Sequence, residues 1–350
     1  MSSLRPVSGS TEAVRVLLEA WEAETDPAPL VVETSGSTGR PKRVVLSRAA
    51  LRASADATHR RLGGPGQWLL NLPAVYVAGL QVLFRSLRAG VPAAEQHGSV
   101  AGAVEAMSGP RRYVSVVPTQ LVRLLRDPAE TRALTRFDAV LVGGGPLRPE
   151  VRRAAESAGI RVVATYGMSE TCGGCVYDGL PLDGVAVKID AAGEVLLTGP
   201  VLFDGYEDDP ERTATVLQDG WLRTADLGRL DEDGRLEVLS RTDDVVISGG
   251  VKVPAPAVQR MLETHPAVRE AAVVGVPDPE WGERVVAVLA GDEPPSLAEL
   301  RDLVTPRPWA PRQVLGVEAL PRLANGKVDR VALRQIALEE AAAGGPAAGA

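Results

Sequence analysis

A run of nine residues early in the chain combines hydroxyl groups, glycines and a lysine in a pattern suited to binding phosphate. Residues 34–42 read Thr-Ser-Gly-Ser-Thr-Gly-Arg-Pro-Lys and follow the apolar residues 30–32. Gly36 and Gly39 allow the backbone to turn so that successive N–H groups point inward, and the hydroxyls and the Lys42 ammonium complete an anion cradle. The run does not fit the P-loop of NTPases, because Pro41 stands where that motif has its second glycine. Taken alone, the segment could also be a solvated Gly/Ser hairpin.

Four further segments, in a fixed order along the chain, carry polar side chains that could take part in binding or catalysis. Residues 166–171 read Tyr-Gly-Met-Ser-Glu-Thr, and residues 223–226 read Arg-Thr-Ala-Asp. Ser-Arg-Thr-Asp-Asp follows at 240–244 with Ile-Ser-Gly-Gly at 247–250, and Pro-Arg-Leu-Ala-Asn-Gly-Lys closes the series at 321–327. Together with the first run, these segments resemble the motifs of the adenylate-forming acyl-CoA synthetase superfamily, the AMP-binding enzymes.

The resemblance implies binding of ATP and assigns residues to it. The phosphate loop would bind the β- and γ-phosphates, Tyr166 would offer a flat face to adenine, and Asp226 would accept hydrogen bonds from the ribose. The nucleotide-binding residues implied are Thr34, Ser35, Gly36, Ser37, Thr38, Gly39, Lys42, Gly143, Gly144, Gly145, Thr165, Tyr166, Gly167, Met168, Asp226 and Arg241.

The resemblance also implies a reaction in two halves. A carboxylate attacks the α-phosphate of ATP and releases pyrophosphate, and a thiol then attacks the acyl-adenylate and releases AMP. Lys327 would stabilise the first transition state, Glu170 would hold Mg²⁺, and Ser169 would contact phosphate. Asp243 is implied as the hinge of a moving C-terminal domain. Gly249, Gly250 and Lys252 would line the channel for CoA.

Within the superfamily, residues 72–86 and 166–178 most resemble the o-succinylbenzoate-CoA ligases of menaquinone biosynthesis. This predicts an aromatic keto diacid as substrate, with an acid pocket formed by Tyr76, Arg85, Cys172, Gly173 and Gly174. Arg85 interrupts a mostly apolar helical pattern, so its guanidinium requires solvent or an anion. We interpret it as a group that recognises the unreacted carboxylate. A surface arginine whose stem lies along the helix is the alternative.

Three other functions stay open at this point. The chain could be another aryl- or acyl-CoA ligase on the same scaffold, or a stand-alone adenylation enzyme that loads a carrier protein. It could also be a catalytically silent ATP-binding module, although the joint presence of Glu170, Asp226 and Lys327 argues against this.

The elements that would position these residues form an α/β fold. Apolar runs at 68–70, 113–117, 139–142 and 162–164 alternate with helical patterns at 49–62, 77–87, 119–126 and 149–158, which predicts a mostly parallel sheet flanked by helices. In such a sheet ligands bind beyond the carboxyl ends of the strands, where residues 143–146 and 166–167 are expected.

After residue 188 short strands and Asp/Gly turns predict a β subdomain, at 193–198, 227–230 and 235–239. Helices at 256–264 and 297–303 and strands at 271–276, 285–289 and near Val314 then predict a small, mobile α+β domain. We therefore expect an N-terminal AMP-binding domain over 1–240, shorter on its N-terminal side than the superfamily pattern. A hinge at 241–244, a C-terminal domain at 245–338 and a disordered tail at 339–350 complete the prediction.

Charge and composition limit the partners. A net charge of −7 with interspersed signs argues against nucleic acid and anionic membranes. No apolar run approaches the thickness of a bilayer, which predicts a soluble, cytoplasmic protein without membrane insertion. Cys172 and Cys175 could form a redox dithiol or half a zinc site, but we interpret them as small apolar residues of the pocket. The sequence leaves the oligomeric state open, including a homodimer.

Overall fold

The computed structural model describes residues 4–34, 42–291, 294–322 and 328–343. By its internal contacts the chain divides into two compact units. The first comprises residues 1–189, 196–224 and 230–236, and the second comprises residues 190–195, 225–229 and 237–350. Each unit has its own hydrophobic core.

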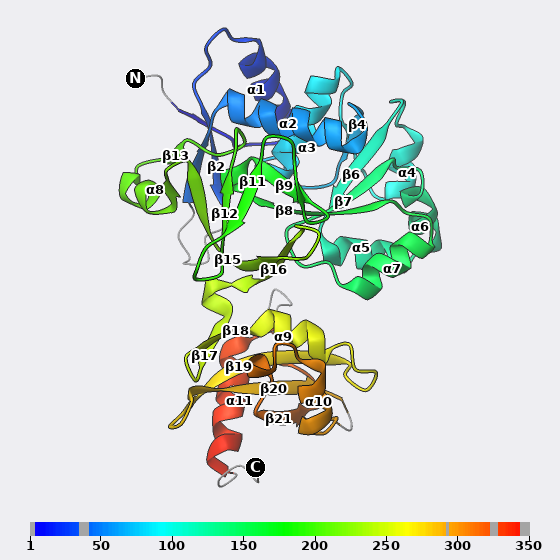
Figure 1. The fold of residues 1–350 in the computed structure, drawn as a ribbon. Helices are drawn as coiled ribbons and strands as arrows, with labels where there is room; N and C mark the ends of the chain where they lie inside the picture. Colours follow the sequence, from blue (N-terminus) through cyan, green and yellow to red (C-terminus); the bar gives the residue numbers. More distant parts are fainter. Residues whose placement is uncertain (1–3, 35–41, 292–293, 323–327, 344–350) are drawn as a thin grey trace. The chain divides into compact units, whose positions relative to one another are not determined.

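The centre of the first unit is a seven-stranded sheet in the order β10-β9-β8-β7-β6-β4-β5 (Figure 1). Five neighbouring strands are parallel, β9 is antiparallel to β8, and β10 is antiparallel to β9. The bounds are β4 Gln67–Leu70, β5 Ala94–Glu95, β6 Arg112–Val116, β7 Ala139–Val142, β8 Val162–Met168, β9 Gly173–Tyr177 and β10 Leu180–Pro181. The predicted doubly wound, mostly parallel sheet is therefore confirmed.

Helices cover both faces of this sheet because successive side chains along a strand point to opposite faces. Leu69, Val114 and Val140 join one core with α4 (Val100–Glu105), α5 (Pro118–Leu125), α6 (Pro128–Leu134) and α7 (Pro149–Ser157). The neighbouring residues Trp68 and Tyr113 face the other way, where their rings lie 5.0 Å apart. The helices α1 (Thr11–Ala23), α2 (Arg48–Leu62) and α3 (Val77–Ala89) belong to this second layer.

The strand β8 is longer than the apolar run 162–164 predicts. It continues to Met168 because β9 pairs with it antiparallel, with Tyr166 opposite Val176 and Met168 opposite Gly173. The expectation that residues 166–167 follow a strand end was therefore wrong. They lie inside the strand, whereas residues 143–145 do follow the end of β7.

A smaller sheet of the first unit brings the phosphate-loop motif to the site. Its order is β1 (Arg5–Pro6), β2 (Leu30–Thr34), β3 (Lys42–Leu46) and β13 (Gly205–Tyr206). Thr34 and Lys42, the two ends of the motif, are opposite each other in the β2–β3 register. The strand β13 pairs with the far edge of β3, which brings Tyr206 opposite Val44.

The predicted β subdomain corresponds to a sheet in the order β11-β12-β15-β14, in which β16 also pairs with β15. The bounds are β11 Ala186–Ile189, β12 Glu194–Thr198, β14 Leu217–Gln218, β15 Trp221–Leu230 and β16 Leu236–Arg241, with α8 at Pro210–Val216.

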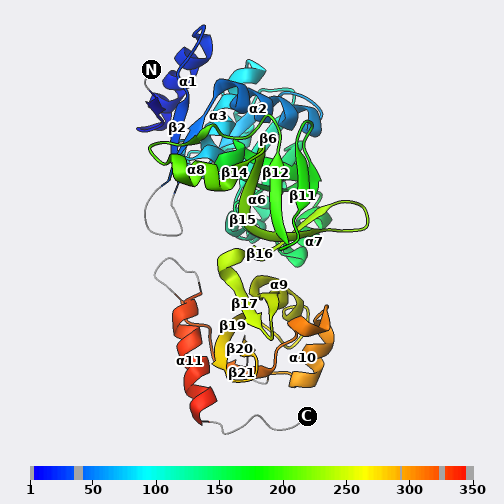
Figure 2. The ribbon, with the colours of Figure 1, turned by 60° about the vertical axis from the view of Figure 1, so that its left-hand side comes forward.

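The second unit is an α+β domain built on a sheet in the order β18-β17-β20-β19, with β21 parallel to β20. Its strands are β17 Val245–Ser248, β18 Val251–Pro254, β19 Glu270–Asp278, β20 Gly282–Ala290 and β21 Gln313–Val317. Both faces are buried: Val273 and Val285 pack toward α9 (Ala255–Leu262) and α10 (Leu297–Leu303), and Val274 and Val286 pack toward α11 (Arg330–Ala343). Figure 2 shows these helices on the two sides of the sheet.

The helix α11 corrects part of the predicted disordered tail. Residues 339–343 are helical, because the helix is anchored by Leu333 and Ala337 in the core and its alanine-rich end has high helix propensity. None of the helices in the described parts of the chain combines the length and apolar character needed to cross a bilayer.

Candidate active site

The phosphate-loop motif and the Tyr166–Thr171 motif meet at a buried carboxylate. Lys42 Nζ lies 3.8 Å from Glu170 Oε1, and the Tyr206 hydroxyl donates a hydrogen bond of 2.7 Å to the same oxygen. Glu170 is 7 % exposed, so its charge is largely removed from water. Burial and the neighbouring Glu170 charge raise the pKa of Tyr206, which keeps the phenol protonated as a donor.

Glu170 is carried by a 3-10 turn, Ser169–Thr171, that is fixed to the strands on both sides. Thr171 Oγ1 accepts a hydrogen bond from Met168 N at 2.9 Å and donates one to Gly173 O at 2.7 Å. Phe203 N donates to the Glu170 carbonyl at 2.9 Å. The turn therefore presents Ser169 and Glu170 from a rigid support.

Two helices hold the residue after this turn. Cys172 has a left-handed backbone with a φ of 52°, an uncommon conformation for a side chain larger than glycine. Its carbonyl accepts hydrogen bonds from Ser54 Oγ on α2 at 3.0 Å and from Gln81 Nε2 on α3 at 2.9 Å. Ser54, Gln81 and Cys172 are almost completely buried.

The glycines predicted to bind the nucleotide lie next to the predicted residues of β8. A side chain at Gly143 would approach Thr165 Oγ1 to 2.4 Å, and one at Gly167 would approach the Gly173 carbonyl oxygen to 2.1 Å. Gly144 has a φ of 76°. The structure thus brings Gly143 against Thr165, just beyond the point where β7 and β8 stop pairing.

One of the predicted acid-pocket residues, Arg85, is a buried cation. Arg85 is 4 % exposed and lies over the Trp68 ring, 5.0 Å from its centroid, so the alternative of a surface arginine was wrong. Burial lowers the pKa of its guanidinium, and the neighbouring Tyr177 opposes this. Within the described residues Arg85 has no carboxylate partner, and its Nε has no hydrogen bond. A buried cation without a counter-ion is a site for an anion.

Contacts link this cation to the predicted pocket glycines. A side chain at Gly174 would reach the Tyr177 ring at 3.0 Å, and one at Gly173 would reach Gln81 Cγ at 3.6 Å. Tyr76, at the start of α3, is half exposed. Burial and the Arg85 charge also lower the pKa of His59 to about 4, which leaves this histidine neutral at pH 7.

Cys172 and Cys175 are free thiols and both are buried. Burial is the main reason that the pKa of Cys172 is raised and that the pKa of Cys175 is raised to about 12. Such thiols stay protonated and pack as small apolar groups, because the reactive form of cysteine is the thiolate.

Another set of predicted residues lies in the second unit. Arg241 Nη1 is 3.6 Å from Asp226 Oδ1, and Arg241 Nε is 3.2 Å from Asp243 Oδ1. Asp226 is buried, whereas Asp243 is exposed. The predicted ribose ligand, its arginine neighbour and the predicted hinge aspartate are therefore adjacent.

Gly249 and Gly250 form the two-residue turn between β17 and β18, in which Ser248 is opposite Val251. Their φ angles are 57° and 77°, as a type I′ turn requires. Lys252 Nζ donates to the Ala192 carbonyl at 3.3 Å. The turn by itself thus explains the two glycines.

Two groups of predicted site residues lie outside the described residues. These are Ser35, Gly36, Ser37, Thr38 and Gly39 of the phosphate loop, and Lys327.

The structure adds three residues that the sequence analysis missed, namely Ser54, Gln81 and Tyr206. Gln81 carried a signal, since it precedes Arg85 by one helical turn and also places a polar group in an apolar helix. Ser54 and Tyr206 carried none, because their partners are over thirty positions away in the chain.

Comparison with known proteins agrees with this fold. Residues 8–207 match the AMP-binding enzyme family, and residues 257–327 match the AMP-binding enzyme C-terminal domain. The chain belongs to the AMP-binding enzyme family.

Three relatives place the chain within the family. It is 46 % identical, over 92 % of its own length and 88 % of the other's, to a probable 2-succinylbenzoate–CoA ligase of Mycobacterium tuberculosis. The o-succinylbenzoate CoA synthetase (MenE) from Bacillus subtilis, solved with its acyl-adenylate intermediate OSB-AMP, is 30 % identical with a TM-score of 0.71, covering 87 % of this chain and 68 % of that one. The same enzyme solved with ATP and magnesium ion has a TM-score of 0.69 at 30 % identity, over 86 % and 69 %. The amide bond synthetase McbA from Marinactinospora thermotolerans is 32 % identical with a TM-score of 0.73, over 88 % and 68 %.

The double support of the Cys172 carbonyl generates a prediction about stability. With either Ser54→Ala or Gln81→Leu one donor remains, whereas the double variant leaves a buried carbonyl without a side-chain donor. We expect the double variant to lose about 1 kcal/mol more free energy of unfolding than the sum of the single variants. Urea unfolding of all four proteins measures this coupling.

A matched control for this cycle combines Gln81→Leu with Gln335→Leu, which removes an exposed hydrogen bond to Glu339 on α11. This pair should be additive. Strict additivity of Ser54→Ala and Gln81→Leu would contradict a shared role in holding Cys172.

Proposed function

We propose that the protein is an AMP-forming acid–thiol ligase that adenylates o-succinylbenzoate with ATP and transfers the acyl group to CoA, giving o-succinylbenzoyl-CoA, AMP and pyrophosphate. The observation that carries this proposal is the meeting of Lys42 and Glu170 at the turn that directly follows β8, the strand that contains residues 165–168. The names of the mycobacterial and Bacillus relatives support the choice of acid.

In the first half-reaction a substrate carboxylate oxygen bonds to the α-phosphorus of ATP, and the bond to pyrophosphate breaks. Charge accumulates on the leaving pyrophosphate, so fixed cations and N–H donors stabilise the transition state. We assign this role to residues 34–39 and Lys42. Ser169, adjacent to Glu170, is assigned to the phosphates through its hydroxyl.

The residues present fit Mg²⁺. This ion prefers oxygen ligands and is commonly bound through one or two carboxylates together with substrate phosphates. Glu170 supplies such a carboxylate, with one oxygen already oriented by Tyr206. When bound, Mg²⁺ would neutralise phosphate charge that otherwise repels the anionic nucleophile.

Two sets of residues are assigned to the nucleoside. Tyr166 and residues 143–145 would contact adenine, with Thr165, Gly167 and Met168 forming the adjacent strand. Asp226 would accept hydrogen bonds from the ribose hydroxyls, and Arg241 would donate to ribose or phosphate.

The second half-reaction uses the C-terminal domain, which we propose to run from residue 245 to 338 and to rotate about a hinge at 241–244, centred on Asp243. The CoA thiol attacks the acyl carbon and AMP leaves. Gly249 and Gly250 would border the thin pantetheine arm, and Lys252 would approach the CoA phosphates.

Lys327 is assigned to the first half-reaction alone. Lys327→Ala should lower adenylation, measured as pyrophosphate release, by on the order of a hundred- to a thousandfold, because one cation of the transition state is lost. Thioester formation from synthetic acyl-adenylate should be retained. Lys188→Ala, which removes a lysine lying over Trp221, is the matched control and should affect neither step. Equal loss of both steps in Lys327→Ala would refute the assignment.

Arg85 is assigned to the carboxylate that does not react. With Arg85→Ala we expect kcat/KM for o-succinylbenzoate to fall about thirtyfold, equivalent to roughly 2 kcal/mol for a charged hydrogen bond. Benzoate, which lacks the second carboxylate, should change little and serves as an internal control for folding. Arg88→Ala is the matched control, because Arg88 lies on the same helix but pairs with Asp56. It should leave kcat/KM for both acids unchanged. Equal losses on the two acids would remove Arg85 from substrate recognition.

The choice of acid is tested directly by measuring pyrophosphate release over a panel of o-succinylbenzoate, benzoate and fatty acids, with and without CoA. We expect o-succinylbenzoate to give the highest kcat/KM and CoA to be required for release of AMP. Equal turnover of fatty acids would favour another acyl-CoA ligase, and indifference to CoA would favour loading of a carrier protein. We assign the enzyme to the cytoplasm, and light scattering of the purified protein tests whether it forms a homodimer.

A further inference from the structure

The first unit contains a polar cavity of about 380 Å³ that none of the assigned residues lines. Its walls come from the residues that follow β4 and β5 and from α5, which follows β6. The cavity therefore opens at the carboxyl ends of parallel strands, the edge of an α/β sheet where ligands bind. Its volume lies in the range of small-molecule sites.

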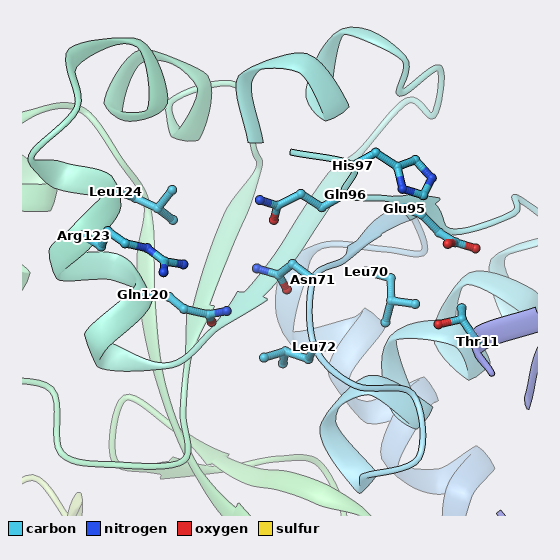
Figure 3. Close-up of a pocket in the computed structure, with 10 residues that line it drawn as sticks. All are labelled: Thr11, Leu70, Asn71, Leu72, Glu95, Gln96, His97, Gln120, Arg123 and Leu124. Atoms are coloured by element: carbon cyan, nitrogen blue, oxygen red, sulfur yellow. The ribbon is translucent and has the colours of Figure 1, made fainter. Parts of the chain in front are cut away.

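Four long polar side chains converge in this cavity. Figure 3 shows Asn71 and Gln96 pointing toward Gln120 and Arg123 on α5, whereas Glu95 and His97 point to the other side. Leu72 lies below Asn71 and Leu124 lies on α5 (Figure 3). Glu95, the one carboxylate among the described residues that line the cavity, thus faces away from Arg123.

Several of these groups have hydrogen-bonding capacity left over. Asn71 Oδ1 is buried and has no partner among the described residues. Gln120 Oε1 accepts from Val117 N at 2.9 Å, and Gln96 Nε2 donates to the Gly98 carbonyl at 2.8 Å. These bonds leave the Gln120 amide as a donor and the Gln96 oxygen as an acceptor. Arg123 is exposed to solvent at the mouth of the cavity, and no ion pair of it is found in the described parts of the chain.

The donors and acceptors in the cavity indicate which chemical groups a ligand should carry. Arg123 and the Gln120 amide are donors suited to a phosphate. Asn71 Oδ1 and the Gln96 oxygen are acceptors that need hydroxyl or amino donors, and a buried acceptor without a donor is costly. Leu72 and Leu124 offer apolar contact to a ring. A phosphorylated ribose carries all of these features.

We propose that this cavity is a second nucleotide site, distinct from the ATP site, that binds the phosphorylated ribose of a nucleotide. The ligand has two sources: the nucleotide end of CoA, in which case the inference rests on the proposed function, or a free adenine nucleotide.

The test uses adenosine 3′,5′-bisphosphate, which matches the ribose end of CoA, as the probe in titration calorimetry. Arg123→Ala and Asn71→Leu should each weaken its binding at least tenfold. Arg126→Ala removes an exposed arginine of the same segment that does not line the cavity, and it should bind the probe as the unaltered protein does. The same affinity in all four proteins, or no binding to the unaltered protein, would overturn the proposal.

Kinetics then distinguishes the two sources. If the ligand is CoA, Arg123→Ala should raise KM for CoA at least fivefold and leave KM for pantetheine, which lacks the nucleotide, unchanged. If the ligand is a free nucleotide, Arg123→Ala should weaken binding of the probe while KM for CoA stays the same. Pyrophosphate release driven by the acid in the absence of CoA reports on adenylation alone. If this release is absent, the proposed function is wrong. Binding of the probe is measured without any acid, so it tests the cavity independently of the proposed function.

Discussion

The candidate site depends on the burial of one carboxylate. Glu170 is held almost out of water, and a buried charge is tolerated only when it is paired and hydrogen-bonded. Its partners come from two other strands: Lys42 begins β3, and Tyr206 ends β13. Because β3 and β13 are neighbours in the small sheet, satisfying Glu170 also fixes that sheet against the end of β8. The ends of the phosphate loop are thereby placed beside the residues assigned to the nucleotide.

Two buried charges of opposite sign, the Glu170 carboxylate and the Arg85 guanidinium, differ in how they are compensated. The Glu170 carboxylate already has a cation and a hydroxyl, and a metal ion would add to these. Arg85, in contrast, is a buried cation that interacts with Trp68, Tyr177 and His59, none of which carries a negative charge. A dianionic acid suits this arrangement, because one carboxylate can approach the nucleotide while the other compensates Arg85. The bonds from Ser54 and Gln81 to Cys172 keep the segment after Glu170 in place.

The sequence predicts which strands are buried better than it predicts which strands pair with each other. The apolar runs of β4, β6 and β7 are evident because those strands are buried on both faces, and the alternating cores around β19 and β20 follow from equally apolar runs. The extension of β8 to Met168 could not be predicted, since it arises from pairing with the glycine-rich β9 and not from its own apolar residues. The same limit applies to the site. Motifs identify Glu170 and Lys42, but the contact with Tyr206 exists only once β13 has paired with β3.

Most glycines of the motifs can be explained without a ligand. Gly143 and Gly167 lack room for a side chain because Thr165 and Gly173 approach them, and Gly144, Gly249 and Gly250 adopt positive φ angles. Each of these glycines is therefore explained by the protein's own backbone or packing, with no ligand required. Gly145 differs: its φ is ordinary, and a side chain there would meet only Pro118, at 3.8 Å. Among the described residues, packing and backbone geometry therefore leave room for a larger side chain at Gly145, in contrast to these other glycines.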